Sequence, residues 1–385
     1  MDKITWVNFL HIYQPPWQDR GVIEQVANQS YDYLLTLLAK YPKFSFTLNI
    51  SGNLVEVLAA QHPDILARLK DAVASGRVEL TASAYYHPLL PLLPKFEIIR
   101  QIELNQAILK KYFGKIKISG FYLPEMAYSL PVAKIIKQLG FQWIILDPIV
   151  YRGAVDNKIL YKIKNLGLTV VFRNREISRS YPPEIIFHKL RSLKQSQLII
   201  TATDGEIYGH FHTDWQGHIE KILLDKNLQV LTATKYLSAL KKSQNIDLRP
   251  ASQASTEAEL KKGIPYAMWS DPKNNIHINL WRLANLAIVL VGKSAKDKNI
   301  TWARRHLDRG LSSCVWWWAS AKKPSPFSAL TWHPDMVDQG ADDLVRSIRS
   351  LGSASSKDKI RAEEICLDIK RHLWLDHWRK YYKNN

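Results

Sequence analysis

Short runs of apolar and β-branched residues recur along the first two thirds of the chain and predict buried strands. These runs cover residues 4–10, 44–50, 78–82, 143–147, 168–172 and 197–204. Between them lie segments with apolar residues at helical spacing, such as residues 31–41 and 63–76. Strands that alternate with helices are typical of a parallel sheet covered by helices, and we expect this sheet to close into a barrel.

The pattern changes near residue 277, beyond which apolar residues recur at helical spacing alone. The segments concerned are residues 278–293, 342–351 and 359–382. A polar stretch at 248–265 precedes them and is typical of a connection between two parts. We therefore predict a barrel domain over residues 1–265, followed by a helical domain over residues 266–385.

Charge and cysteine content narrow the class of protein. The chain has 385 residues and a formal net charge of +18, but its Lys and Arg residues are scattered and no nucleic-acid-binding motif accompanies them. We therefore expect no nucleic-acid partner. Only two cysteines are present, which excludes a disulfide framework and favours a reducing compartment.

Neither a secretion signal nor a membrane span is expected from the apolar runs. Residues 1–16 contain only a short apolar stretch, unlike a secretion signal. The longest apolar run, residues 283–291, is shorter than the roughly 20 residues needed to cross a bilayer. A cytoplasmic protein is the resulting expectation. No glycine-rich phosphate loop occurs either, so we expect no nucleotide cofactor.

Several polar residues lie at or just beyond the predicted strands. They are His11, Glu79, Glu125 and Asp204, with Glu206 two residues after Asp204. In a barrel the carboxyl ends of the strands share one rim, so we expect these side chains to face a common cavity. Two carboxyl groups about 5–5.5 Å apart can cleave a glycosidic bond with retention, because one attacks the anomeric carbon while the other protonates the departing oxygen.

Aromatic residues are numerous, with 13 tryptophans and 17 tyrosines, and several adjoin the polar residues. Trp17, Tyr122 and Tyr208 are examples. Sugar rings have apolar C–H faces that stack on aromatic planes, so this composition favours a polysaccharide-binding cleft. The alternative is that the rings fill the core, and for the run VWWWAS at 315–320 both interpretations have equal weight.

Five short segments resemble, in the same order, the five sequence regions of glycoside hydrolase family 57. They are HIYQPP at 11–16, GRVEL at 76–80, GFYLPEMAY at 120–128, TATDGEIYGHF at 201–211 and LSSCVWWWAS at 311–320. The resemblance implies an incomplete (β/α)7 barrel followed by a helical region that completes the substrate cleft. It also implies a retaining mechanism on α-glucans, with an oligo- or polysaccharide as partner and no metal or other cofactor.

The resemblance also assigns roles to residues. Glu125 falls on the family's nucleophile and Asp204 on its acid/base, so Asp204 begins protonated and delivers its proton to the leaving oxygen. Substrate contacts are expected from this motif set and from neighbouring loops at His11, Gln14, Trp17, Glu79, His87, Tyr122, Glu206, Trp269 and Trp316. The chain departs from the family pattern at Tyr13, where histidine is usual, and at Tyr122, where tryptophan is common.

Two alternatives remain open from the sequence. The segment GHFHTDWQGH offers His210, His212, Asp214 and His218, and such a set could hold a metal in a deacetylase-like carbohydrate hydrolase. A carbohydrate-binding relative without turnover is the other alternative. The sequence does not distinguish hydrolysis from transglycosylation. It also does not distinguish cleavage of α-1,4 linkages from cleavage of α-1,6 linkages, or recognition of glucose from recognition of galactose.

Overall fold

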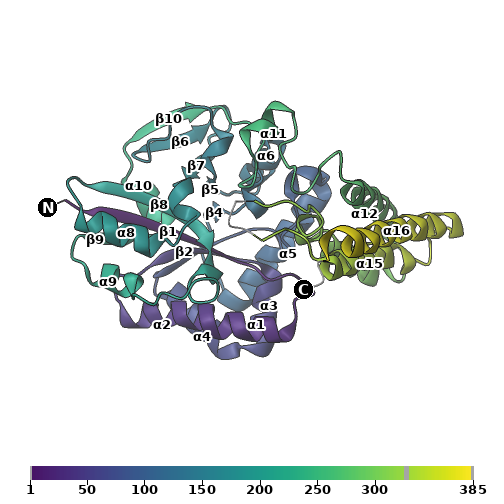
Figure 1. Ribbon diagram of the computed structural model, residues 1–385, viewed down its shortest axis with the longest axis horizontal. Coiled ribbons are helices and arrows are strands. Elements are labelled where there is room, and N and C mark those ends of the chain that lie inside the picture. The colour runs from purple at the N-terminus through teal and green to yellow at the C-terminus, as the bar shows by residue number, and fades with distance from the viewer. Residues whose placement is uncertain (1, 325–328, 383–385) are drawn as a thin grey trace. The chain divides into compact units, whose positions relative to one another are not determined.

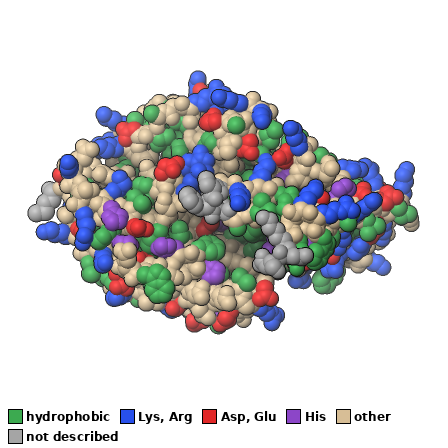
Figure 2. All heavy atoms as spheres, viewed as in Figure 1, with side chains coloured by type: hydrophobic (Ala, Val, Ile, Leu, Met, Phe, Trp, Pro, Cys, Tyr) green, Lys and Arg blue, Asp and Glu red, His purple; other side chains and the backbone are tan. Residues whose placement is uncertain are grey.

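The computed structural model describes residues 2–324 and 329–382, and it divides into two compact units. The first unit comprises residues 1–14, 18–85 and 90–253. The second comprises residues 254–385 together with the short segments 15–17 and 86–89. Figure 1 shows strands surrounded by helices in the first unit and helices alone in the last third of the chain. Lys and Arg side chains occur over the whole visible face and form no single patch there (Figure 2).

Seven parallel strands form a curved layer in the first unit. In spatial order they are β8 (Gln197–Asp204), β1 (Ile4–Ile12), β2 (Phe46–Ile50), β3 (Val78–Thr81), β4 (Gly120–Phe121), β5 (Trp143–Leu146) and β7 (Thr169–Phe172). A parallel bridge between Ala82 and Phe121 joins β3 to β4. Between β7 and β8 no ladder forms among the described residues, although Asn174 N donates to Ile200 O at 2.7 Å. The layer is therefore a barrel that stays open on one side.

Three further strands extend this layer. β9 (Leu228–Leu231) pairs with the first half of β1. β2 pairs with the second half of β1, along the same edge. β6 (Ile159–Ile163) runs antiparallel to β7, and β10 (Lys242–Ile246) pairs with β6.

Helices follow most of the strands and cover the outside of the layer (Figure 1). They are α1 (Arg20–Val26), α2 (Asp32–Lys40), α3 (Gly52–Gln61), α4 (Pro63–Ala74), α5 (Lys95–Phe113), α6 (Leu130–Gln138), α7 (Arg175–Ser178), α8 (Pro182–Arg191) and α9 (His218–Leu224). In α4, Pro63 lies in the first turn, where its missing N–H costs nothing, and Ile65, Leu66 and Leu69 form the buried stripe. These stripes pack with strand residues such as Trp6 into one large apolar core.

Helix α10 (Ala233–Ala239) begins against the amino-terminal ends of the strands. Ala233 N donates to Thr47 Oγ1 at 2.8 Å, and Thr234 N donates to Glu79 Oε2 at 3.0 Å. Trp143 Nε1 donates to Thr234 Oγ1 at 3.1 Å. Because Thr47, Glu79 and Trp143 are the first or second residues of their strands, α10 lies at the end of the barrel opposite to the strands' carboxyl ends.

The second unit is helical. Its helices are α11 (Glu257–Lys261), α12 (Asn275–Lys293), α13 (Ile300–Gly310), α14 (Cys314–Trp317), α15 (Pro334–Arg349) and α16 (Ser356–Asp376). α15 packs against α12, α13 and α16 through buried residues such as Leu344 and Ile348. Gly340 allows close approach, since a Cβ there would lie 2.3 Å from the Val315 side chain. Among residues 2–324 and 329–382, no helix is both long and apolar enough for a membrane span.

Candidate active site

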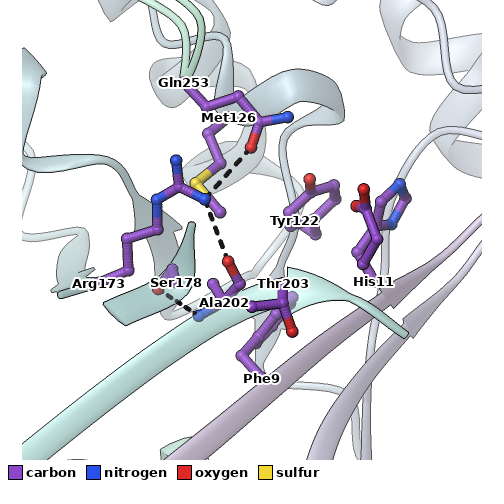
Figure 3. A pocket seen from close by; sticks show the side chains of 10 residues that line it. Phe9, His11, Tyr122, Met126, Arg173, Ser178, Ala202, Thr203 and Gln253 are labelled. Atoms are coloured by element: carbon purple, nitrogen blue, oxygen red, sulfur yellow. Dashed lines mark hydrogen bonds between the residues drawn. The ribbon is translucent and has the colours of Figure 1, made fainter. Parts of the chain in front are cut away.

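A small cavity opens at the carboxyl ends of the strands in the first unit. It has a volume of about 90 Å³ and is lined by Phe9, His11, Tyr122, Met126, Arg173, Ser178, Ala202, Thr203, Asp204 and Gln253. Figure 3 shows Arg173, Met126 and Gln253 on one side of this cavity, with Tyr122 and His11 on the other. The barrel brings most of these residues together because they lie in the last half of a parallel strand or in the segment that follows it, whereas Gln253 comes from the segment after β10.

His11 and Asp204 are direct neighbours across the ladder between β1 and β8. His11 Nδ1 donates to Asn49 Oδ1 at 2.8 Å, and the imidazole stacks on Tyr122 with ring centroids 4.5 Å apart. Burial lowers the pKa of His11, although the charge of Asp204 and the bond with Asn49 act in the opposite direction. His11 is therefore a neutral imidazole whose Nε2 is an acceptor. Asp204 ends β8 and is exposed at the rim.

Glu125 lies in a strained turn. It belongs to the 3₁₀ turn η3 (Pro124–Met126), with φ 60° and ψ 17°, and Met126 also has a positive φ, of 47°. Left-handed backbone at two consecutive non-glycine residues costs on the order of 1–3 kcal/mol each and persists only where neighbours enforce it. The segment 251–253 supplies such neighbours, since Gln253 N donates to Glu125 O at 3.0 Å and Tyr128 N donates to Ala251 O at 2.8 Å.

The pKa of Tyr122 responds to the charges of both candidate catalytic acids. Burial raises the pKa of Tyr122 well above its ordinary value, and the negative charges of Glu125 and Asp204 raise it further. Two carboxylates that are 79 positions apart in the sequence (204 − 125) therefore act on one buried ring. Tyr122 also stacks on Phe9 at 5.5 Å, which fixes the ring that lies between the acids and the barrel core.

Glu206 lies behind the rim and is only 3% exposed. Tyr31 Oη donates to Glu206 Oε1 at 2.7 Å, and Gln14 Nε2 donates to the same oxygen at 3.2 Å. Burial raises the pKa of Glu206 to about 8, and the charge of Asp204 adds to this effect. Glu206 is therefore a neutral carboxylic acid at pH 7, and with Gln14 and Tyr31 it forms a buried support for the turn that follows Asp204.

A buried ion pair lies beneath the other side of the cavity. Asp147 is 0% exposed, and its Oδ2 accepts from Arg173 Nε at 2.9 Å and from Arg173 Nη2 at 2.7 Å. Arg173 Nη1 donates to Ala202 O at 3.1 Å and faces Gln253 Oε1 at 3.5 Å (Figure 3). The amide of Gln253 reaches Glu125 in turn, because its Nε2 donates to Glu125 Oε2 at 3.1 Å.

These three residues were not among the sequence-predicted site residues. Asp147 ends the run WIILD and Arg173 directly follows the run LTVVF, so each carried the same signal as Asp204, a polar residue at the end of an apolar strand. Gln253 carried no such signal. It lies in the polar stretch 248–265, which the sequence pattern describes only as a connection.

Glu79 lies apart from the other predicted residues. It is the second residue of β3, level with Thr47 of β2, and therefore lies toward the amino end of the barrel. Its carboxylate accepts from Thr47 Oγ1 at 3.2 Å, from Thr234 N at 3.0 Å and from Thr234 Oγ1. An acid in this position caps the amino terminus of α10 and is not available at the cavity.

Two predicted tryptophans are core residues of the second unit. Trp269 is 0% exposed and packs on Trp317, and Trp316 is 1% exposed and stacks on Trp281 at 4.3 Å. The surface of a fully buried ring is already covered by protein atoms, so stacking a sugar on it would require repacking of its neighbours.

The remaining two predicted contacts also belong to the second unit. Trp17 is half-buried, and its Nε1 donates to Asp343 Oδ2 at 2.8 Å. His87 is buried with a positive φ of 56°, and its Nδ1 lies 3.0 Å from Ser313 Oγ. These contacts account for the placement of both side chains inside that unit.

The rings near the acids are more buried than a sugar-binding cleft requires. Phe121, Tyr128 and Tyr208 are at most 1% exposed and pack into the core. Of the rings in the segment GFYLPEMAY, only Tyr122 lines the cavity. The expected wall of stacking aromatics beside Glu125 is therefore reduced to one ring, because Phe121 packs on Phe141 and Tyr128 is buried.

Of the residues that suggested a metal, His218 and Asp214 approach each other, with Nδ1 and Oδ1 3.4 Å apart, whereas His210 and His212 contact other residues. His210 Nδ1 pairs with Gln29 Oε1 at 2.8 Å, and His212 packs on Tyr181 with ring centroids 4.2 Å apart. Asp214 instead accepts from the backbone N–H groups of His218 and Ile219 at the start of α9. Within the described part of the chain, no group of three or more His, Cys, Asp or Glu residues has a metal-binding arrangement.

Comparison with known proteins decides the family. The sequence model of Glycosyl hydrolase family 57 matches residues 9–249, which is more than half of the chain. The chain belongs to this family. An α-amylase of Pyrococcus abyssi is 25% identical over 274 residues, which cover 63% of this chain and 40% of that relative. The chain therefore spans about two fifths of the length of the curated relatives that it matches.

Two crystal structures share the fold. The 4-α-glucanotransferase of Thermococcus litoralis has a TM-score of 0.72 at 17% identity, over 91% of this chain and 60% of that one. A family 57 branching enzyme of Thermococcus kodakaraensis has a TM-score of 0.64 at 17% identity, over 97% of this chain and 95% of that one. The expected incomplete (β/α)7 barrel followed by a helical region is confirmed.

Proposed function

We propose that this family 57 protein is a retaining glycoside hydrolase or transglycosylase that acts on α-glucans through a covalent glycosyl-enzyme. The observation that carries the proposal is that Asp204 lines the cavity at the carboxyl ends of the strands together with Gln253, whose amide donates to Glu125 Oε2 at 3.1 Å. Relatives with the names α-amylase and 4-α-glucanotransferase support the α-glucan substrate, an oligo- or polysaccharide. Catalysis is assigned to the first unit, which contains both acids.

In the first step, Glu125 attacks the anomeric carbon while the bond to the leaving oxygen breaks. Asp204 transfers its proton to that oxygen, so that a neutral alcohol departs and a glycosyl ester of Glu125 forms. Asp204 is suited to this role because it is exposed at the end of β8, where it can meet both the departing and the incoming oxygen.

In the second step, the two acids reverse their parts. Asp204 removes a proton from water or from a sugar hydroxyl, whose oxygen attacks the anomeric carbon and releases Glu125 as a carboxylate. Water as the acceptor gives hydrolysis, and a sugar hydroxyl gives transglycosylation. Two inversions at one carbon leave the α configuration unchanged.

His11 is proposed to orient the sugar. Its Nδ1–H donates a hydrogen bond to Asn49 Oδ1, which fixes the tautomer in which Nε2 carries the lone pair. Nε2 is the atom proposed to accept from a sugar hydroxyl. The stacking on Tyr122 holds the imidazole face to face with that ring, 22° from parallel, and its strand pairing places it beside Asp204. A neutral imidazole is required for this role, and the burial that lowers the pKa of His11 supplies it.

Incubation with maltooligosaccharides, amylose, pullulan and an aryl α-galactoside tests the proposal. Longer and shorter oligomers that appear together from one maltooligosaccharide indicate transfer, and reducing ends alone indicate hydrolysis. Glu125→Ala and Asp204→Ala serve as the inactive controls for each substrate. Binding of an α-glucan without any product, by protein that is folded and saturated with substrate, would instead support a carbohydrate-binding role.

A further inference from the structure

We propose that Gln253 is a positioning residue for the nucleophile. Its side-chain amide is held by Arg173 of the buried Asp147–Arg173 pair and in turn holds the carboxylate of Glu125 in place. The inference deepens the proposed function and rests on Glu125 acting as the nucleophile. Its basis is a series of contacts that runs from Asp147 through Arg173 and Gln253 to Glu125. Figure 3 shows the link between Arg173 and Gln253.

The chemistry of the partners fixes the orientation of the Gln253 amide. Arg173 can only donate hydrogen bonds, so the atom 3.5 Å from its Nη1 must be the carbonyl oxygen Oε1. The amide NH2 group then faces Glu125, and Nε2 donates to Oε2 at 3.1 Å. With the reverse orientation, two donors would meet at Arg173 and two acceptors at Glu125.

Asp147, at the buried end of this series of contacts, is held by two arginines. Asp147 is fully buried and binds Arg173 through two nitrogens, and Arg175 Nη1 lies 3.5 Å from Asp147 Oδ1. Arg173 Nη1 also donates to Ala202 O on β8, two residues before Asp204. The guanidinium therefore joins the strand that ends in the acid/base to the amide that contacts the nucleophile.

The backbone of Gln253 adds a second link to the same turn. Gln253 N donates to Glu125 O at 3.0 Å, and Gln253 O accepts from Arg175 Nη2 and Arg179 Nη2, each at 3.4 Å. Because the backbone at Glu125 is in the left-handed region, its side-chain direction depends on these restraints. A substitution of the Gln253 side chain keeps these backbone bonds and removes its two side-chain contacts, with Arg173 Nη1 and with Glu125 Oε2.

The change Gln253→Met tests the inference. It keeps the length of the side chain and removes the amide. A hydrogen bond to a charged group has a magnitude that corresponds to about a 10- to 100-fold effect, so we expect kcat to fall by about that factor with little change in KM. Inactivation by 5-fluoro-α-glucosyl fluoride should slow by a similar factor, since that reagent reports formation of the glycosyl-enzyme. Gln244→Met is the matched control, because Gln244 is exposed on β10.

A second experiment, with variants that lack Glu125, separates positioning of the nucleophile from general structural damage. In Glu125→Ala, azide can replace the carboxylate as the nucleophile toward an aryl α-glucoside, and the product is then a β-glycosyl azide with the aryl alcohol as leaving group. Adding Gln253→Met to Glu125→Ala should leave this azide-dependent rate unchanged, because the group that Gln253 positions is already absent.

The outcomes are distinguishable. A Gln253→Met enzyme with normal kcat, beside an inactive Glu125→Ala enzyme, would overturn the inference and leave the proposed function intact. An azide-dependent rate that falls in the double variant would also overturn it, because the loss would then be structural. Full activity of Glu125→Ala would overturn the proposed function itself.

Discussion

The two ends of the barrel carry acids of the same kind in opposite settings. At the amino end, Glu79 accepts hydrogen bonds from Thr47 and from the start of α10, so both of its oxygens take part in structural contacts. At the carboxyl end, Asp204 is exposed at the rim and Glu125 Oε2 accepts from the side-chain amide of Gln253 at 3.1 Å. The difference indicates that position along a strand, rather than residue type, separates a structural acid from the acids that we propose to be reactive.

The largest expected difference is in turnover. Glu125→Ala and Asp204→Ala should each lower kcat by several orders of magnitude, because the covalent route requires both a nucleophile and a proton donor. Glu79→Ala should keep kcat within a few-fold of the wild type. The three variants are compared under saturation with the best maltooligosaccharide. Equal losses in all three would remove the distinction between the two ends.

The next largest effect is expected beneath the rim, at the Asp147–Arg173 pair. Arg173→Met leaves a fully buried Asp147 without its main partner and should lower the free energy of unfolding by about 3–5 kcal/mol. In the double variant Asp147→Asn with Arg173→Met, both charges are gone and the oxygen that accepts from Ile149 N is kept. Urea unfolding should show that this double variant recovers most of the loss; no recovery would mean that packing, not charge, dominates.

The third expected effect is the pH dependence caused by Glu206. Its pKa is raised by burial to about 8, above the value in the unfolded chain, so the folded protein binds one more proton than the unfolded chain at intermediate pH. Stability should therefore fall as pH rises from about 4.5 to 8. Glu206→Gln removes this contribution. The free energy of unfolding of the variant minus that of the wild type should therefore become more positive as pH rises over that window. A difference that is flat with pH would contradict the buried, neutral state.

The smallest expected effect is at Glu79. Glu79→Ala removes the acceptor at the start of α10 and should lower the free energy of unfolding by about 1–2 kcal/mol, as the loss of a helix cap does. Glu79→Gln keeps one acceptor oxygen and should lose less. Thermal unfolding of the two variants gives the comparison. An unchanged melting temperature in Glu79→Ala would show that α10 does not depend on this carboxylate.

Much of the barrel could be predicted from the pattern of apolar residues. The run at 197–204 coincides with β8, and the run at 143–147 contains β5. β4 is only Gly120–Phe121, too short to give a pattern, although the motif around Glu125 marks its end. β10 is polar at every position except Ile246 and so forms no apolar run, while in β6 Lys162 interrupts a short apolar segment.

The candidate site was predictable where a residue ended a strand. His11, Asp204 and Tyr122 meet at one cavity for that reason. Glu79 has the same sequence context, but it stands near the beginning of a four-residue strand, and the length of an apolar run does not reveal where the strand starts. For Trp269 and Trp316, helical spacing could not distinguish a ring that faces a ligand from one that faces another helix.

Labelling of the nucleophile tests the central claim most directly. The enzyme is treated with 5-fluoro-α-glucosyl fluoride, digested with pepsin, and the modified peptide is sequenced by mass spectrometry. The account predicts one sugar ester per chain, on Glu125, and no label in Glu125→Ala. An ester on Glu79 or Glu206, or rapid turnover of substrate by an enzyme that never accumulates an ester with this reagent, would contradict it.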